Sequence, residues 1–394
     1  MHFCNWNHLF VVPHDRKSLL KNGSVFVFRI QKIIGRHKQR SICWRNAICT
    51  HPQPTADYSI LSSYPTSNKF FHKKPQNPNT KQNKISPATP MDSKSSISEV
   101  SFEFPTLFRI YNDGRTERLK GTETVPPSTD PTTGVQSKDI VLSPQSGLSA
   151  RVFLPKLPDP TRKLPLLIFI HGGAFVIESP YSPLYHNHVS LLASEANVVA
   201  LSVHYRRAPE HPLPVAFEDS WDAVQWAAAH SNRNGPEAWL NDRVDFDRVF
   251  IGGDSAGATL THHVVRQAGL DGLSGTRIVG MILFHPFFVN DEPGKLLEVI
   301  YPTCGGSDDP RMWPGKDPKL GEIGCGRVLV FVAEKDFLRD RGWAYYEALK
   351  KSGYGGVVEI VESEGEGHVF HLFNPSCDKA VDLVRKVVFF INQD

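Results

Sequence analysis

One serine of the chain stands where its hydroxyl could act as a nucleophile. Ser255 is the central residue of GDSAG, which ends the apolar run RVFIGG and opens ATLTHHVVRQAG, a stretch with the pattern of a helix. A strand, a sharp turn carrying a serine and a helix together make the G-x-S-x-G nucleophile elbow. Gly253 and Gly257 suit such a turn, because a Cβ would clash where the strand and helix backbones come together.

A serine hydroxyl is a weak nucleophile until a base takes its proton, and the base in turn needs an acid that holds its tautomer. After a strand–serine–helix turn of this kind the acid and then the histidine follow in the chain. The apolar run RVLVFVA is followed by EKDFLRDRG, in which Asp336 is the preferred acid and Glu334 the reserve. Asp340 ranks third, because it lies near the start of a predicted helix, where acids often cap or balance the dipole.

The candidate base follows the next apolar run, VVEIVES. In EGEGHVFHLF, His368 comes directly after a glycine, in a predicted loop. His371 lies three residues later, at the start of an apolar stretch, and is the weaker candidate. His368 therefore completes the predicted order of serine, acid and base.

Backbone amides that could stabilise a tetrahedral oxyanion follow an earlier apolar run, in LLIFIHGGAF. Gly172 and Gly173 carry no side chains, so their N–H groups can approach a developing negative charge together with that of Ala256. Any one of these motifs could be an ordinary turn, but their combination in this order is specific.

Short apolar runs and amphipathic stretches alternate from residue 100 onward, which predicts an α/β protein. Strands alternating with helices indicate a mostly parallel central sheet flanked by helices on both faces. The earlier runs follow one another without helices between them, which favours antiparallel pairing at one edge. The predicted strands are LFRIY, DIVL, ARVFL, PLLIFI, VVALSV, RVFIGG, GMILF, RVLVFVA and VVEIV. The main predicted helices are HNHVSLLASEA, AFEDSWDAVQWAAAH, the stretch after Ser255, RGWAYYEALKKSG and CDKAVDLVRKVVFFINQ.

Charge divides the 394 residues into two parts. Residues 1–90 hold 14 Lys and Arg against two Asp, a net charge of +12, and are rich in polar residues and proline after Pro52. We expect this part to be a disordered extension, either a transit peptide or a dispensable leader preceding a start at Met91. Residues 91–394 carry 30 basic and 39 acidic residues, a net charge of −9, which argues against nucleic acid as a partner. We expect a cytoplasmic location, or a plastid if residues 1–90 act as a transit peptide.

Composition also excludes several classes of site. The six cysteines show no CxxC spacing, so neither a zinc site nor a disulfide framework is indicated, and no metal or organic cofactor is expected. No apolar run approaches the roughly 18 to 20 residues that span a bilayer, so no membrane association is expected. A single sequence does not reveal a self-complementary surface, so no oligomeric state is predicted.

From about Phe102 to the C-terminus the chain resembles the plant carboxylesterases of the hormone-sensitive-lipase-like branch of the α/β-hydrolases. The resemblance rests on HGGAFVIESPYSPLYHNHV, VHYRRAPEHPLPVAFEDSWDAVQWAAAH, WLNDRVDFDRVFIGGDSAGATL, AEKDFLRDRG and EGHVFHLFNP. It implies an α/β-hydrolase catalytic domain over 91–394 with a cap formed partly by the segment after Met91. It also implies Ser255, Asp336 and His368 as the triad. Ala174 stands where a third glycine is usual.

The resemblance implies hydrolysis of small-molecule carboxylic esters through an acyl-enzyme. Arg206, Arg207 and Glu210 in YRRAPEHPLP are expected to be a structural brace rather than catalytic groups. Relatives with this fold also include a 2-hydroxyisoflavanone dehydratase, tuliposide-converting transesterases and gibberellin receptors. The receptors have lost the catalytic histidine, so the presence of His368 favours an enzyme over a binding protein.

Overall fold

The computed structural model describes residues 99–157, 159, 161–289, 294–304 and 309–393. The predictions for residues 1–90, including the possible transit peptide, concern residues outside those that the structure describes. Among the helices described, none is both long and apolar enough to cross a membrane.

The central sheet has eight strands in the order β11-β10-β9-β8-β6-β7-β5-β4. The six strands from β11 to β7 in this order are parallel to one another. Strand β5 runs antiparallel to both β7 and β4. The predicted α/β-hydrolase fold, with a mostly parallel sheet and an antiparallel edge, is thus confirmed. The strands are β4 (Gln136–Ser143), β5 (Leu148–Leu154), β6 (Leu164–Ile170), β7 (Val199–His204), β8 (Val244–Asp254), β9 (Ile278–Phe284), β10 (Arg327–Ala333) and β11 (Val357–Ser363).

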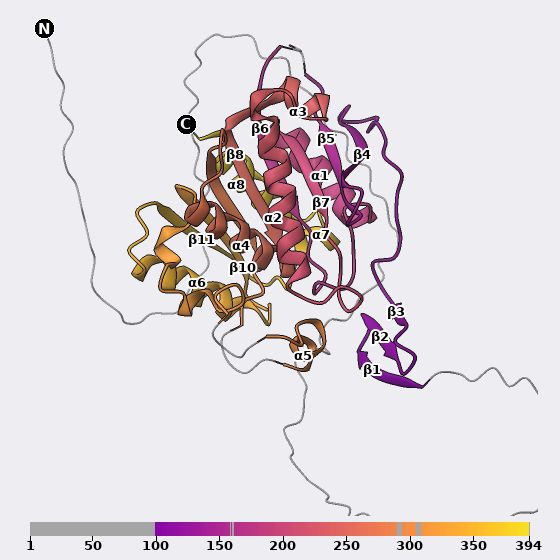
Figure 1. Ribbon diagram of the computed structural model, residues 1–394. Helices are drawn as coiled ribbons and strands as arrows, with labels where there is room; N and C mark the ends of the chain where they lie inside the picture. The colour runs from indigo at the N-terminus through magenta and orange to yellow at the C-terminus, as the bar shows by residue number, and fades with distance from the viewer. Residues whose placement is uncertain (1–98, 158, 160, 290–293, 305–308, 394) are drawn as a thin grey trace, which may run out of the picture. The chain divides into compact units, whose positions relative to one another are not determined.

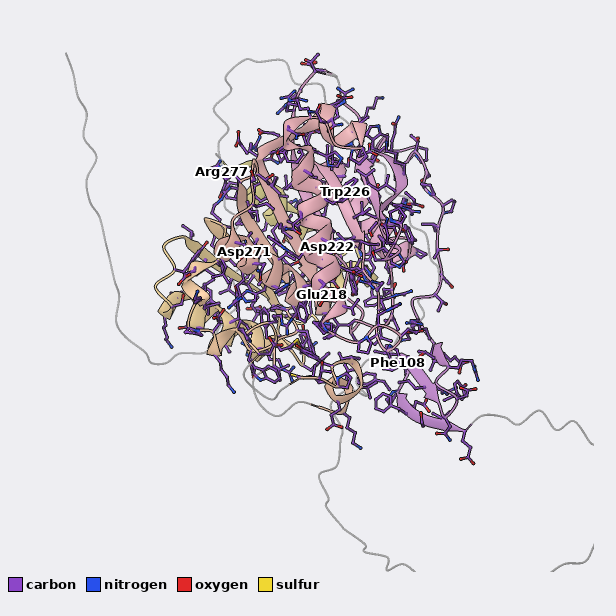
Figure 2. The ribbon with its side chains drawn as sticks, viewed as in Figure 1. Phe108, Glu218, Asp222, Trp226, Asp271 and Arg277 are labelled. Atoms are coloured by element: carbon purple, nitrogen blue, oxygen red, sulfur yellow. The ribbon has the colours of Figure 1, made fainter. Side chains whose placement is uncertain are left out.

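Helices cover both faces of this sheet, as Figure 1 shows for α2 and α4 on the face toward the viewer. Alternate residues of β6 enter two separate cores, Ile168 with α2, α4 and α6, and Phe169 with α1, α7 and α8. In Figure 2, Glu218, Asp222 and Trp226 mark the outer side of α2. The helices are α1 (Pro183–Ala196), α2 (Val215–Ala228), α3 (Ala238–Arg243), α4 (Ala256–Asp271), α5 (Lys295–Ile300), α6 (Arg339–Lys351), α7 (Phe370–Phe373) and α8 (Asp378–Asn392).

A separate three-stranded antiparallel sheet precedes the central sheet in the chain. It is formed by β1 (Val100–Phe104), β2 (Phe108–Tyr111) and β3 (Thr116–Arg118). Only β2 was expected from the sequence; β1 is mostly exposed, and β3 has only three residues, all partly buried. Phe108 of β2 is fully buried, and the Arg118 guanidinium forms two hydrogen bonds with Glu210, at 2.8 and 2.7 Å. The cap function of this segment stays a prediction.

Candidate active site

Ser255 occupies a strained turn between β8 and α4, with φ 50° and ψ −118°. Its backbone is fixed from the next strand, because its N–H donates to the Phe284 carbonyl at 2.8 Å and its carbonyl accepts from Phe287 at 3.0 Å. A Cβ on Gly253 or Gly257 would overlap the carbonyl oxygen of Ile170. The two glycines thus allow β8 and α4 to approach β6 closely enough to form the elbow.

The structure brings the predicted serine, acid and base together. His368 Nε2 lies 3.0 Å from Ser255 Oγ, and His368 Nδ1 lies 2.8 Å from Asp336 Oδ2. The Asp336 side chain is fully buried, while the His368 side chain is 19% exposed. An Nδ1–H that donates to the carboxylate leaves Nε2 with a lone pair facing the serine hydroxyl, which is the tautomer that a general base needs.

Asp336 receives a further donor that the sequence analysis missed. His285 Nδ1 lies 2.9 Å from the same Oδ2 atom, and the backbone N–H of Leu338 donates to Oδ1 at 2.8 Å. Burial opposes ionisation, yet the hydrogen bonds from His285 and His368 outweigh it and hold the pKa of the Asp336 carboxyl well below its usual range. One sequence feature could have identified His285: it directly follows an apolar run, at the sheet edge that also carries Ser255 and Asp336.

The reserve candidates for acid and base lie elsewhere. The Glu334 carboxylate accepts from the Gly365 amide at 2.7 Å, and Asp340, with an 85% exposed side chain, pairs with Arg339 in the first turn of α6. His371 is buried and stacks on Phe284 and His285. None of the three has a recorded hydrogen bond with Ser255 or His368 in the described part of the chain.

The prediction for one oxyanion donor needs correction. The Gly172 N–H already donates to Asp254 Oδ1 and to the Tyr185 hydroxyl, each at 3.0 Å, so it is not free for a substrate oxyanion. The amides of Gly173 and Ala256 donate no hydrogen bond to any described residue. Ala256 is the first residue of α4, where backbone amides lack helical partners and the helix dipole favours negative charge.

The charged residues after β7 bond to groups elsewhere in the fold and not to the serine. Arg206 pairs with the fully buried Asp219 at 2.7 Å, and Arg207 Nη1 donates to the Glu178 carbonyl at 2.5 Å. Asp219 is the buried half of this ion pair. These contacts agree with the expected structural brace.

His285, Asp336 and His368 also present three ligand-type atoms within 4.8 Å of one another. The separations of 2.8 and 2.9 Å are those of hydrogen bonds, and an imidazole nitrogen that donates its N–H has no lone pair for a metal. The arrangement is explained by two imidazole N–H groups that donate hydrogen bonds to one carboxylate.

Comparison with known proteins identifies the family. A family model described as the alpha/beta hydrolase fold matches residues 167–303 and 295–372. "Probable carboxylesterase 5" of Arabidopsis thaliana is 46% identical over 315 residues, covering 75% of this chain and 99% of its own. This chain belongs to the plant carboxylesterases of the α/β-hydrolase superfamily. It is a carboxylic ester hydrolase.

Two further matches extend this assignment. The "2-hydroxyisoflavanone dehydratase" of Glycyrrhiza echinata is 43% identical over 323 residues, covering 76% of this carboxylesterase and 98% of its own chain. A solved Pyrobaculum calidifontis esterase matches with a TM-score of 0.54 and 27% identity, over 65% of this chain and 84% of that one. The carboxylesterase thus shares its family with at least one protein named for a different reaction.

Proposed function

We propose that this carboxylesterase hydrolyses small-molecule esters through an acyl-enzyme on Ser255. His368 takes the hydroxyl proton as Ser255 Oγ attacks the ester carbonyl carbon, and Asp336 stabilises the imidazolium that forms. The carbonyl oxygen becomes an oxyanion held by the amides of Gly173 and Ala256. The alcohol leaves with the proton from His368, and a water activated by the same base then releases the acid.

The observation that carries this proposal is the continuous chain of hydrogen bonds from Ser255 through His368 to Asp336, at 3.0 and 2.8 Å. The strained backbone of Ser255 supports it, because strain of this kind is retained where the surrounding structure enforces it, often at reactive residues. The unused amide at the start of α4 adds a site for the negative charge beside the same serine.

Hydrolysis of short-chain p-nitrophenyl esters by the full chain tests the proposal, beside Ser255→Ala and His368→Ala. Each variant should lose roughly 10⁴-fold or more in kcat, because residues of a triad act as a unit. Mass spectrometry after treatment with a fluorophosphonate should place one adduct on Ser255. Full turnover by Ser255→Ala would overturn the acyl-enzyme mechanism.

A dehydratase is the second candidate, supported by the relative of that name. There His368 would remove a proton from the carbon beside a carbonyl, and the oxyanion donors would hold the enolate oxygen. The enolate would then expel the hydroxyl group as water, with the proton returned by His368. Because no acyl-enzyme forms in an elimination, activity toward such a substrate should survive in Ser255→Ala, and its product would be the dehydrated compound.

A further inference from the structure

The segment 284–287 contacts both the candidate nucleophile and the candidate acid. Its backbone fixes Ser255 through the Phe284 carbonyl at 2.8 Å and the Phe287 amide at 3.0 Å. Between these two residues, the His285 side chain reaches Asp336 Oδ2 at 2.9 Å. A single turn after β9 therefore holds the backbone of one member of the triad and the side chain of another.

The geometry around the His285 imidazole suits a donor at Nδ1 and an unprotonated Nε2. Its side chain is fully buried, and burial lowers its pKa despite the carboxylate beside it. Its Nε2 has no hydrogen-bond partner among the described residues, which suits a bare lone pair and not an N–H. The backbone N–H of His285 donates to the Phe331 carbonyl at 2.8 Å, so the residue is anchored to β10 at a φ of 50°.

We propose that His285 is a positioning residue, whose Nδ1–H fixes the Asp336 carboxylate so that Oδ2 faces His368. Leu338 N–H holds Oδ1 and His285 holds Oδ2, which prevents rotation of the carboxylate about its Cβ–Cγ bond. His368 then finds its acceptor already oriented at 2.8 Å. This role rests on the triad proposed above, and His285 itself touches neither the serine hydroxyl nor the substrate carbonyl in that mechanism.

The competing explanation is that His285 only fills space. Its ring lies 5.6 Å from that of His371 and 5.8 Å from that of Phe370, as one member of a buried aromatic cluster. His371 provides a matched control, because it lies in the same cluster and neither of its ring nitrogens has a partner in the described part of the chain. Loss of ring packing and loss of the Asp336 hydrogen bond can therefore be separated.

The test compares His285→Phe, which keeps a ring without a donor, with His285→Asn, whose amide can donate from nearly the place of Nδ1. We expect His285→Phe to lower kcat and the rate of Ser255 labelling by a fluorophosphonate by roughly 10- to 100-fold, since a hydrogen bond to a charged group is lost. KM should stay within about twofold. His285→Asn should recover most of the rate, and His371→Phe should stay within about threefold of wild type. His285→Leu replaces His285→Phe if that variant does not fold.

Four results would overturn the inference. Equal losses in His285→Phe and His285→Asn, or a loss no greater than in His371→Phe, would leave His285 with a packing role only. In the same series, full activity of Ser255→Ala would remove the proposed triad and this inference with it. Loss of activity in Ser255→Ala with an unchanged His285→Phe would reject the His285 role alone.

Discussion

The amide of Gly172 donates a 3.0 Å hydrogen bond to Oδ1 of Asp254, the residue that precedes Ser255. The other carboxylate oxygen of Asp254 accepts from the Tyr185 hydroxyl at 2.8 Å. The loop after β6 and the elbow after β8 are thus joined by one buried carboxylate. Because Gly173 follows Gly172 directly, this contact also sets where the proposed oxyanion donor lies relative to the serine.

Substitution of Asp254 tests that link. Asp254→Asn keeps an oxygen that can accept from Gly172, and should retain kcat to within roughly tenfold. Asp254→Ala removes the acceptor and frees the loop, so kcat should fall by about 10² to 10³, the usual cost of losing one oxyanion donor. Steady-state kinetics with p-nitrophenyl esters decide, and equal rates for the two variants would mean that the loop is held by other contacts.

Gly257→Ala tests the steric requirement of the elbow. The added Cβ would overlap the carbonyl oxygens of Ile170 and His171, which are backbone atoms that cannot move aside cheaply. We expect a loss of about 1–3 kcal/mol in the free energy of unfolding, as for other overpacked sites, together with a large fall in kcat. Gly355→Ala is the control, because nothing lies within 4 Å of a Cβ at that position. Similar urea unfolding curves for both variants would contradict the prediction.

The Arg206–Asp219 pair should stabilise the fold without contributing to catalysis. Asp219 is fully buried and accepts from the Arg206 backbone at 2.8 Å and its guanidinium at 2.7 Å. Arg206→Met would leave the buried carboxylate without a cation, which typically costs about 3–5 kcal/mol. Arg385→Met breaks an exposed pair with Asp382 and should cost less than about 1 kcal/mol. Urea denaturation measures both, and KM should be unchanged in each.

Buried histidines should make the protein sensitive to mild acid. Burial lowers the pKa of His188 and of His204 from 6.5 to about 4. Between pH 6.5 and 4 these histidines are therefore protonated in the unfolded chain and neutral in the folded chain. The free energy of unfolding falls as the pH drops through this range, by about 1.4 kcal/mol per pH unit for each group. Asp336, whose pKa is lowered, contributes stability that is lost only below about pH 4.

His188→Phe should reduce this dependence. The ring stacks edge-on against Phe169 and Phe284, and its Nε2 has no partner among the described residues, so phenylalanine preserves the packing. Thermal melts between pH 7.5 and 4.5 should show the variant gaining on wild type as the pH falls. A constant difference in Tm across that range would mean that folding does not lower the pKa of His188.

The elements of the site were predictable from the sequence because they depend on neighbours in the chain. The glycines around Ser255 describe a steric need of one turn, and the apolar runs before Asp336 and His368 mark strands that end at the same edge of a parallel sheet. Short elements such as β1 and α3 were missed, because they lack the periodicity that distinguishes a strand or helix.

The sequence alone therefore determined that Ser255, Asp336 and His368 reach one edge of the sheet, and in what order they occur in the chain. Only the tertiary structure decided how their hydrogen-bonding groups are shared, since that depends on partners brought together by packing. Gly172 and Asp254 are 82 residues apart, and His285 and Asp336 are 51 apart. No local pattern records that the first contact takes an amide from the predicted oxyanion donors, or that the second adds a histidine to the candidate acid.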